Sequence, residues 1–353
     1  MLIEPTQISN GSGMPTIKDI ARLSGVSYQT VSCVFSNGRT VSPKTVKKVL
    51  DAAAALNYTP NALARGLVNK KGINSIGIVF PYSAHILGHH YLGPLADAII
   101  ATATERKQSV TIFVATSASP KPEDVLIYND GRCDGILVVG QPNDSPFVLA
   151  MAQSPRPFVC VNECWDTSVA PFVDADQVSA ARSVAQHLIS LGHRRIAVLS
   201  GYDQNVHVQQ RNEGCARAFA SADMSTVEGR FWPGDYSDSS VDARISKIFE
   251  PSDRPNWPTA IIGHNDFIAL RAMERLEALG VRCPRDVSIV GIDDIKQASE
   301  SSPRLTTVNL RFAECGSVAT EMLLRLINND TLETTQVRLP CNLVVRESTG
   351  PPA

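Results

Sequence analysis

The chain has 353 residues, more than one hydrophobic core usually serves, so we expect two or three compact units. Its formal net charge of −2 neither indicates nor excludes nucleic acid as a partner. Residues 1–14 are polar and contain no apolar signal-peptide region, and no apolar run approaches the roughly 20 residues that a membrane span requires. We therefore predict a disordered tail over residues 1–14, a cytoplasmic protein and no membrane partner.

Charge is distributed unevenly along the chain. Residues 15–71 contain nine Lys or Arg residues against the two acids Asp19 and Asp51, so this segment carries +7 and the rest of the chain −9. A basic segment joined to an acidic remainder is typical of a protein in which one part contacts phosphate groups. The basic residues are Lys18, Arg22, Arg39, Lys44, Lys47, Lys48, Arg65, Lys70 and Lys71.

The start of this basic segment has the layout of a helix-turn-helix. Apolar residues from Ile17 lie at helical spacing as far as a tight turn at Gly25. A second helix is predicted to open at Ser27, with Tyr28 and Gln29 in its first turn. In a helix-turn-helix the second helix enters the major groove with its N-terminal residues, so DNA binding is the leading hypothesis.

Two further signals complete a DNA-binding headpiece over residues 15–60. Thr16 and Asp19 form a capping-box pattern at the first helix, and Ser42-Pro43 is a start signal for a third helix. A stripe of apolar residues along the third helix is predicted to be buried against the first two. The stripe is Val46, Val49, Leu50, Ala53 and Leu56, and the facing residues are Ile17, Ile20, Leu23, Val31 and Val34.

Residues 61–72 are predicted to form a hinge helix and a linker. Thr59-Pro60 interrupts the headpiece, and Ala62–Leu67 is too short to hold as an isolated helix. Gly66 costs about 1 kcal/mol relative to alanine in a helix. A segment that is helical only when docked couples binding to folding.

The phrase Tyr58–Leu67, YTPNALARGL, after the helix-turn-helix resembles the lactose-repressor-like (LacI/GalR) family of bacterial transcriptional regulators. The resemblance implies a nucleoid-associated repressor whose hinge helix folds on operator DNA, with Leu67 as an apolar wedge in the minor groove. The implied partner is double-stranded operator DNA of near-palindromic sequence. The implied DNA-binding residues are Thr16, Ser27, Tyr28, Gln29, Thr30, Ser32, Cys33, Asn37, Asn61, Ala64 and Leu67.

The second helix departs from the family pattern at one position. The family commonly has Ser-Arg-Val where this chain has Ser32-Cys33-Val34. Arginine there could donate two hydrogen bonds to guanine, which cysteine cannot do. Tyr28 and Gln29 remain as base readers, and glutamine suits adenine, so the operator sequence stays open.

From Ile76 onward, short apolar runs alternate with amphipathic stretches. This alternation predicts an α/β fold of parallel sheets with helices on both faces, and seven strands over this length suit two lobes better than one sheet. The predicted strands are 76–80, 110–114, 136–139, 158–161, 196–199, 260–262 and 288–290, and the predicted helices lie near 92–106, 177–191, 209–221, 240–249, 266–279 and 312–328.

Further phrases extend the family resemblance over nearly the whole chain. They imply a core similar to periplasmic sugar-binding proteins, in which two parallel, doubly wound sheets form two lobes with a ligand between them. The core then spans 73–349, with lobe 1 at about 73–172 and 308–332 and lobe 2 at about 173–305 and 335–349. The matching phrases are Arg132–Ile136, His187–Ile196, Arg211–Gly214, Asn265-Asp266, Val287–Asp294 and Pro303–Thr307.

Polar residues that follow the predicted strands are the candidate effector site, because ligands bind beyond the carboxyl ends of parallel strands. Carboxylates, amides and a guanidinium that converge on one site suit a polyhydroxylated ligand. Aromatic side chains at positions resembling those of the family's pocket would supply an apolar face. The candidate effector residues are His85, Asn162, Phe172, Arg211, Tyr236, Asn265, Asp293 and Phe312.

No metal site or cofactor is predicted. His85 and His89 have i, i+4 spacing, but no carboxylate lies at a matching distance and no HExxH phrase is present, so surface or pocket histidines are the better interpretation for these two and His90. The eight cysteines include no Cys-x-x-Cys pair, which favours reduced thiols.

Three functions are compatible with a two-lobed binding core. A repressor controlled by a small effector, most simply a sugar or sugar derivative, explains the headpiece. The effector could be an inducer, or a purine or other corepressor. A sugar-binding transport receptor has no use for a headpiece, and no catalytic motif indicates an enzyme. A near-palindromic operator requires a two-fold axis, hence a homodimer; the C-terminal residues 346–353 cannot form the leucine heptad of family tetramers.

Overall fold

The computed structural model divides into two compact units, Met1–Ser75 and Ile76–Ala353. The predicted tail 1–14, the hinge segment 61–71 and the loop that holds His85, His89 and His90 lie outside the described residues. Within the described part of the chain, no helix is long and apolar enough to cross a membrane. The structure describes residues 15–36, 41–58, 72–81, 92–115, 117, 120–165, 170–224 and 231–352.

The described part of the first unit contains the helices α1 (Ile17–Ser24), α2 (Tyr28–Ser36) and α3 (Pro43–Ala55). Gly25 follows α1 in the left-handed region, with φ of 67°, and makes the tight turn before α2. Asp19 accepts hydrogen bonds from the backbone N–H and the hydroxyl of Thr16, at 2.9 and 2.7 Å. The buried core of the headpiece is Ile20, Val31, Val49, Ala52 and Ala53.

Two residues that the sequence predicted to be buried in the headpiece are exposed. Leu23 is 40% exposed and Leu50 is 50% exposed. On α3 the buried face carries Val49, Ala52 and Ala53, because residues three and four positions apart share a helix face. Leu50 lies about 100° around the helix axis from Val49 and therefore points away from the core.

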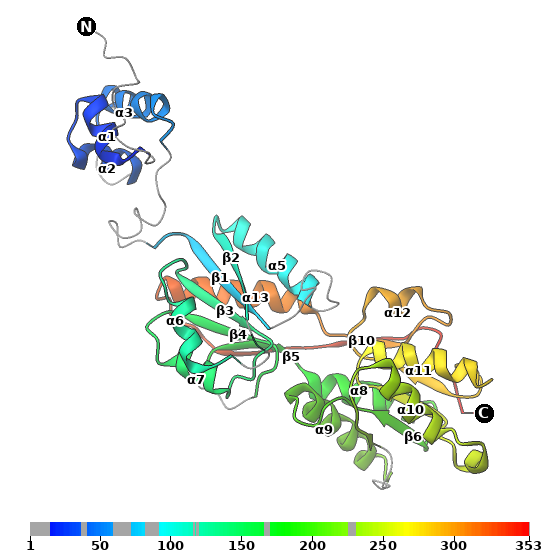
Figure 1. Cartoon of the computed structure of the whole chain (residues 1–353). Helices are drawn as coiled ribbons and strands as arrows, with labels where there is room; N and C mark the ends of the chain where they lie inside the picture. Colours follow the sequence, from blue (N-terminus) through cyan, green and yellow to red (C-terminus); the bar gives the residue numbers. More distant parts are fainter. Residues whose placement is uncertain are drawn as a thin grey trace. The chain divides into compact units, whose positions relative to one another are not determined.

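The first lobe is built on six strands, β1 (Ser75–Phe80), β2 (Ser109–Val114), β3 (Gly135–Val139), β4 (Phe158–Val161), β5 (Phe172–Ala175) and β11 (Gln336–Leu339). Their order in the sheet is β11-β5-β4-β3-β1-β2 (Figure 1). The pairs β1–β3, β3–β4, β4–β5 and β5–β11 are parallel. The helical segments of this lobe are α5 (Leu92–Glu105), η2 (Pro122–Asp124), α6 (Val125–Tyr128), α7 (Pro146–Ala152) and α13 (Phe312–Ile327).

Successive side chains of these strands enter two hydrophobic clusters on opposite faces of the sheet. Ile78 and Phe80 of β1 share one cluster with α5 and α13, whereas Val79 shares the other with α6 and α7. Helices α5 and α13 approach closely at Gly316, where a Cβ atom would lie 2.6 Å from the Leu95 carbonyl oxygen. The sheet is therefore covered on both faces, as parallel sheets require.

The second lobe contains the strands β6 (Ile196–Leu199), β7 (Phe231–Trp232), β8 (Ala260–Gly263) and β9 (Ser288–Val290), in the parallel order β7-β6-β8-β9. Residues of α8 and α9 share one hydrophobic cluster with these strands, and residues of α10 and α11 share a second one. The helical segments are α8 (Gln177–Ser190), α9 (Val206–Ser221), α10 (Asp238–Ile248), η3 (Pro251–Asn256), α11 (Asp266–Ala278) and α12 (Lys296–Glu300).

Three chain segments connect the two sheets. The first runs from β5 to α8, the second includes β10 (Thr307–Asn309) before α13, and the third includes β12 (Asn342–Val344) after β11 (Figure 1). Strands β10 and β12 pair with each other in antiparallel fashion. The carboxyl end of β5 thus leads into a connection between the lobes, and the segment after β4 contacts α9 of the second lobe.

The structure corrects three sequence-based expectations for the core. Residues 173–175 and 336–339 belong to the first sheet, whereas the predicted boundaries placed them in lobe 2. Strand β2 was predicted to be buried, but only Phe113 is, because β2 is the edge of its sheet. Helix α9 begins at Val206, three residues before the predicted start at 209, because the Asn205 side chain caps it, and Arg211 therefore lies in its second turn.

Candidate functional site

The N-terminal end of α2 presents the polar side chains expected of a recognition helix. Ser27 caps this helix, since its Oγ accepts a hydrogen bond of 3.1 Å from the Thr30 N–H. Tyr28 is 46% exposed and Gln29 is also exposed, whereas Val31 is fully buried and fixes the helix to the headpiece core. Tyr28 and Gln29 are therefore accessible at the N-terminal end of α2, and their role as base readers stays a prediction.

The remaining predicted DNA-binding residues fall into two groups. Thr30, Ser32 and Cys33 are partly buried along α2, and Thr16 is an exposed residue at the start of α1. The residues of the second group lie outside the described part of the chain; they are Asn37, Asn61, Ala64 and Leu67.

In the second lobe, Arg211 is the centre of a buried cluster that we call the Arg211 cluster, consisting of Gln177, Arg211, His264 and Asp293. The Arg211 side chain is 9% exposed and that of Asp293 is 4% exposed. Nε of Arg211 donates to Gln177 Oε1 at 2.8 Å, and its two Nη atoms donate to the His264 carbonyl oxygen and to Asp293 Oδ1, the latter at 3.3 Å. The guanidinium thus joins α8, α9 and the ends of β8 and β9.

The other polar residues predicted at these strand ends have structural partners. Asn265 caps α11, with its Oδ1 accepting from the Ile268 N–H at 2.9 Å. Asp266 is buried and accepts hydrogen bonds from the Thr307 hydroxyl and the Ile295 N–H. Burial and, next, the Asp293 carboxylate raise the pKa of Asp266 above its usual range. Asp293 itself has φ of 130°, an unfavourable backbone region for a residue with a side chain.

Several buried polar atoms have no hydrogen-bond partner among the residues that the structure describes. In the Arg211 cluster these are both ring nitrogens of His264 and Nε2 of Gln177, and in the first lobe they include both side-chain polar atoms of Asn162, which follows β4. Burial and then the charges of Arg211 and Arg244 lower the pKa of His264 well below its ordinary value, so this imidazole is neutral. An unpaired buried polar group costs about 1–3 kcal/mol, which a binding partner could offset.

The three predicted pocket aromatics occupy different surroundings. Phe172 is fully buried in the first-lobe core, with the Arg338 guanidinium 5.1 Å from its ring centroid, so it does not line a ligand pocket. Phe312, the first residue of α13, is also packed in the core and 9% exposed. Tyr236 is 42% exposed; it stacks edge-on against Tyr202 and borders a groove lined by α11 and α12.

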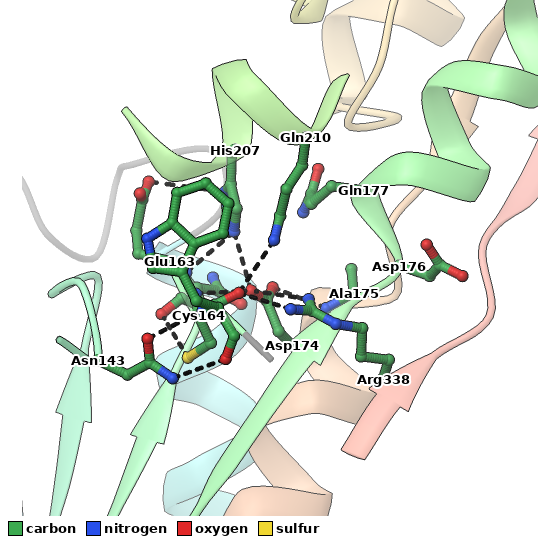
Figure 2. A network of polar contacts seen from close by, with 12 residues as sticks. Asn143, Glu163, Cys164, Asp174, Ala175, Asp176, Gln177, His207, Gln210 and Arg338 are labelled. Atoms are coloured by element: carbon green, nitrogen blue, oxygen red, sulfur yellow. Dashed lines mark hydrogen bonds and ion pairs between the residues drawn. The ribbon is translucent and has the colours of Figure 1, made fainter. Parts of the chain in front are cut away.

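A second polar network joins the two lobes, and we call it the His207 cluster. It contains Glu163 and Cys164 after β4, Asp174 of β5, His207 of α9 and Arg338 of β11 (Figure 2). His207 Nε2 lies 3.0 Å from Asp174 Oδ2, and Arg338 Nη1 lies 3.6 Å from the same oxygen. The Cys164 N–H donates to that oxygen at 3.0 Å. The buried Asp174 carboxylate is thus paired from both lobes.

The sequence analysis did not identify the His207 cluster, although one signal was available. Asp174 is a carboxylate inside the buried strand Phe172–Ala175, and a buried charge must be paired. Its partner His207 is 33 residues away on the other lobe, and Arg338 is still farther along the chain. Sequence spacing could not bring these three residues together without the fold.

Comparisons with known proteins match both parts of the chain. Residues 16–61 match the model of bacterial regulatory proteins of the lacI family, and residues 185–349 match a periplasmic binding protein-like domain. Catabolite control protein A of Priestia megaterium is 31% identical over 339 residues, which are 95% of this chain and 99% of that protein.

Solved structures of similar proteins extend over both units. The lac repressor dimer bound to operator and the anti-inducer ONPF is similar with a TM-score of 0.82 and 28% identity, covering 96% of this chain and 100% of that chain. The complex of the transcriptional regulator CelR with cellobiose is similar with a TM-score of 0.69 and 28% identity, covering 95% and 99%. These similarities confirm the predicted fold, a helix-turn-helix headpiece followed by a periplasmic-binding-protein-like core.

Proposed function

The chain belongs to the lacI family of bacterial regulatory proteins and is a DNA-binding transcriptional regulator, and from this premise we propose that it is a repressor whose operator affinity is controlled by a neutral sugar. The sugar binds at the Arg211 cluster, together with Asn162 and Asn265. We further propose a cytoplasmic homodimer on a near-palindromic operator, with no catalytic activity and no cofactor, because a two-fold operator requires a two-fold protein.

One observation carries the sugar assignment: the buried groups of the Arg211 cluster and of Asn162 that have no partner among the described residues are neutral and include both donors and acceptors. Asn162 and His264 each offer a donor and an acceptor, and Gln177 offers a donor. The cation in this cluster, Arg211, is already paired with Asp293. A phosphate or carboxylate ligand would need an uncommitted cation, whereas sugar hydroxyls pair with mixed donors and acceptors.

The family comparison adds support of the same kind. The CelR structure contains cellobiose, a neutral sugar, and its chain aligns with 95% of this one. Tyr28 and Gln29 are the residues that we propose to read operator bases, and the basic residues of the headpiece supply phosphate contacts. Each phosphate that is neutralised adds about −0.9 to the log–log dependence of operator affinity on salt.

A thermal-shift screen followed by an operator titration tests this function. The screen compares neutral sugars, sugar phosphates and purines, since a ligand at a hundred times its dissociation constant stabilises the protein by about 2.7 kcal/mol. We expect a neutral sugar to raise the melting temperature and to change the affinity for DNA from upstream of the protein's own gene. Stabilisation by a purine or a sugar phosphate alone would contradict the sugar assignment, and equal affinity for that DNA and random DNA would contradict operator binding.

A further inference from the structure

His207 lies between two carboxylates of the first lobe although it belongs to the second. It is in the first turn of α9, and its side chain is 12% exposed. Its Nε2 lies 3.0 Å from Asp174 Oδ2, and its Nδ1 lies 3.6 Å from Glu163 Oε1. Figure 2 shows the ring projecting from the helix towards both residues.

The Nε2 atom of His207 faces two partners that it cannot bind in the same protonation state. The Glu163 backbone N–H lies 2.9 Å from it and can donate to Nε2 only when this nitrogen carries no proton. The Asp174 carboxylate, 3.0 Å away, accepts a hydrogen bond from Nε2 only when the nitrogen is protonated. Uptake of one proton therefore exchanges the Glu163 N–H contact for an ion pair with Asp174.

Charged groups from several elements face this ring, and their balance favours the imidazolium. The carboxylates of Asp174 and Glu163 favour the positive charge on the ring, and two arginines oppose it. One is Arg338, which is paired with Asp174. The other is Arg211 on α9 itself, which is paired with Asp293. The Cys164 thiol also lies in the cluster, where burial first and Asp174 next raise its pKa and keep it neutral. Burial lowers the pKa of His207, but Asp174 and Glu163 outweigh it, so that the pKa is raised above 6.5.

Other contacts show that this cluster is where the lobes touch. Asn205, the residue that caps α9, donates from Nδ2 to Glu163 Oε1 at 2.9 Å. Gln210 of α9 donates from Nε2 to the Cys164 carbonyl oxygen at 3.0 Å. Both contacts run from the second lobe to the segment after β4, as the His207 contacts do. The donors of both contacts are side-chain amides, which do not titrate, so His207 is the residue of α9 in this set whose charge depends on pH.

We infer that His207 is a proton-dependent latch between the two lobes: in its imidazolium form it binds Asp174 and Glu163 and holds the lobes in the arrangement of this structure. Loss of the proton removes the positive charge that faces Asp174 and Glu163. In the neutral tautomer that accepts from the Glu163 N–H, Nε2 presents a lone pair to Asp174, and the latch is released. The link from lobe arrangement to operator affinity rests on the proposed function, whereas the latch itself does not.

The sign of the dependence follows from the raised pKa of His207. The stabilisation of this lobe arrangement is fully present below about pH 6.5 and is lost as the pH rises through the raised value. For each unit by which the pKa differs between the two lobe arrangements, their equilibrium changes about tenfold across the titration. The proton and the effector then act on the same equilibrium between arrangements.

Nuclear magnetic resonance of the full chain, labelled at histidine, tests the latch directly. We expect the His207 ring to titrate above pH 6.5, and the Glu163→Gln substitution to lower that midpoint by about one unit because a single nearby charge is lost. Glu163 is partly exposed, so the variant keeps its fold. His187, which contacts Thr349 and not this cluster, is the internal control and should not shift. A His207 midpoint at or below 6.5, or one that Glu163→Gln leaves unchanged, overturns the proposal.

Small-angle scattering and operator binding then test its consequence. The wild type and the control His187→Gln should change their radius of gyration and their operator affinity between about pH 6 and pH 8.5, and His207→Gln should change neither. A pH response that persists in His207→Gln overturns the latch. If the scattering responds to pH as expected but no DNA is bound specifically at any pH, the latch is supported and the proposed function fails.

Discussion

The Arg211 cluster and the His207 cluster are both buried and polar, but they differ in what remains unpaired. Among the described residues, neutral donors and acceptors of Gln177 and His264 in the Arg211 cluster, and of Asn162 after β4, have no partner. Around His207, the charged groups pair with one another across the lobes. The first pattern is that of a site prepared for a ligand, and the second is that of a contact that fixes an arrangement. Two polar clusters in one fold can therefore have opposite roles.

The largest effect expected is on stability, from Arg211→Ala. This change leaves the Asp293 carboxylate and Gln177 Oε1 buried without their partner, and breaking a buried pair costs about 3–5 kcal/mol. Urea unfolding measures the loss. The control is Arg217→Ala on the same helix, where the Arg217–Glu213 pair is largely exposed and is worth less than about 1 kcal/mol.

Equal unfolding free energies for the Arg211 and Arg217 variants would contradict the pairing of Arg211 in the structure. The sequence indicated Arg211 as a candidate effector contact. The structure adds a role in holding α8, α9 and the ends of β8 and β9 together. A loss of effector response in Arg211→Ala is thus interpretable only beside its unfolding curve.

The sequence predicted the elements that depend on neighbouring residues, and it did not predict those that depend on pairing between residues far apart in the chain. Local signals were sufficient for the helices of the headpiece, because Gly25 and Ser42-Pro43 act on their own neighbours. Alternation predicted the central strands β1 and β8, but β5 and β11 were not predicted as strands of the first sheet. Their membership depends on pairing between residues such as Val173 and Val337, which are far apart in sequence.

The site residues show the same limit. Arg211, Asn265 and Asp293 follow strands or carry family phrases, and they do lie at the carboxyl ends of the second sheet. Phe172 faces the first-lobe core, because the alternation of side chains along β5 decides which face it occupies, and the sequence did not predict β5 as a strand. His207 belongs to none of the family phrases, and its role depends on the contact with Asp174 in the other lobe.

Two matched substitutions, one in each cluster, should change the unfolding free energy by different amounts, and both changes should be smaller than that of Arg211→Ala. His207→Phe removes a charged partner of Asp174 and should lower the unfolding free energy by about 1.5–3 kcal/mol. His264→Phe removes two unpaired nitrogens, and replacing such groups by apolar atoms of similar shape is nearly neutral, within about 1 kcal/mol. Urea unfolding at one pH compares them.

Effector binding should show the reverse order for these two variants. His264→Phe should weaken binding of the sugar found in the screen by about 1–3 kcal/mol, whereas His207→Phe keeps the ligand-facing groups. Calorimetric titration of each variant measures this. A strongly destabilised His264→Phe with unchanged sugar affinity would remove His264 from the site.

The smallest effect is the pH dependence of stability, in which His207 and His264 should act with opposite signs. The pKa of His207 is raised, so its contribution is fully present below about pH 6.5 and is lost as the pH rises through the raised value. The pKa of His264 is lowered, so its contribution is present above 6.5 and is lost as the pH falls towards the lowered value. These two contributions alone would place a maximum of stability near pH 6.5, and the buried Asp266 adds a contribution that is lost as the pH rises through its raised pKa of about 7.

The contribution of each histidine can be measured by substitution. A shift of one pKa unit corresponds to about 1.4 kcal/mol, which urea unfolding between about pH 5 and pH 8.5 resolves. We expect His207→Gln to reduce the loss of stability at alkaline pH and leave the acid side unchanged, and His264→Phe to reduce the loss of stability at acid pH. Part of the loss at acid pH should remain in His264→Phe, because burial also lowers the pKa of His187 and His193. A loss of stability at alkaline pH that is as large in His207→Gln as in the wild type would mean that His207 does not bind its proton more tightly in the folded protein, and the contrast between the two clusters would then lose its electrostatic basis.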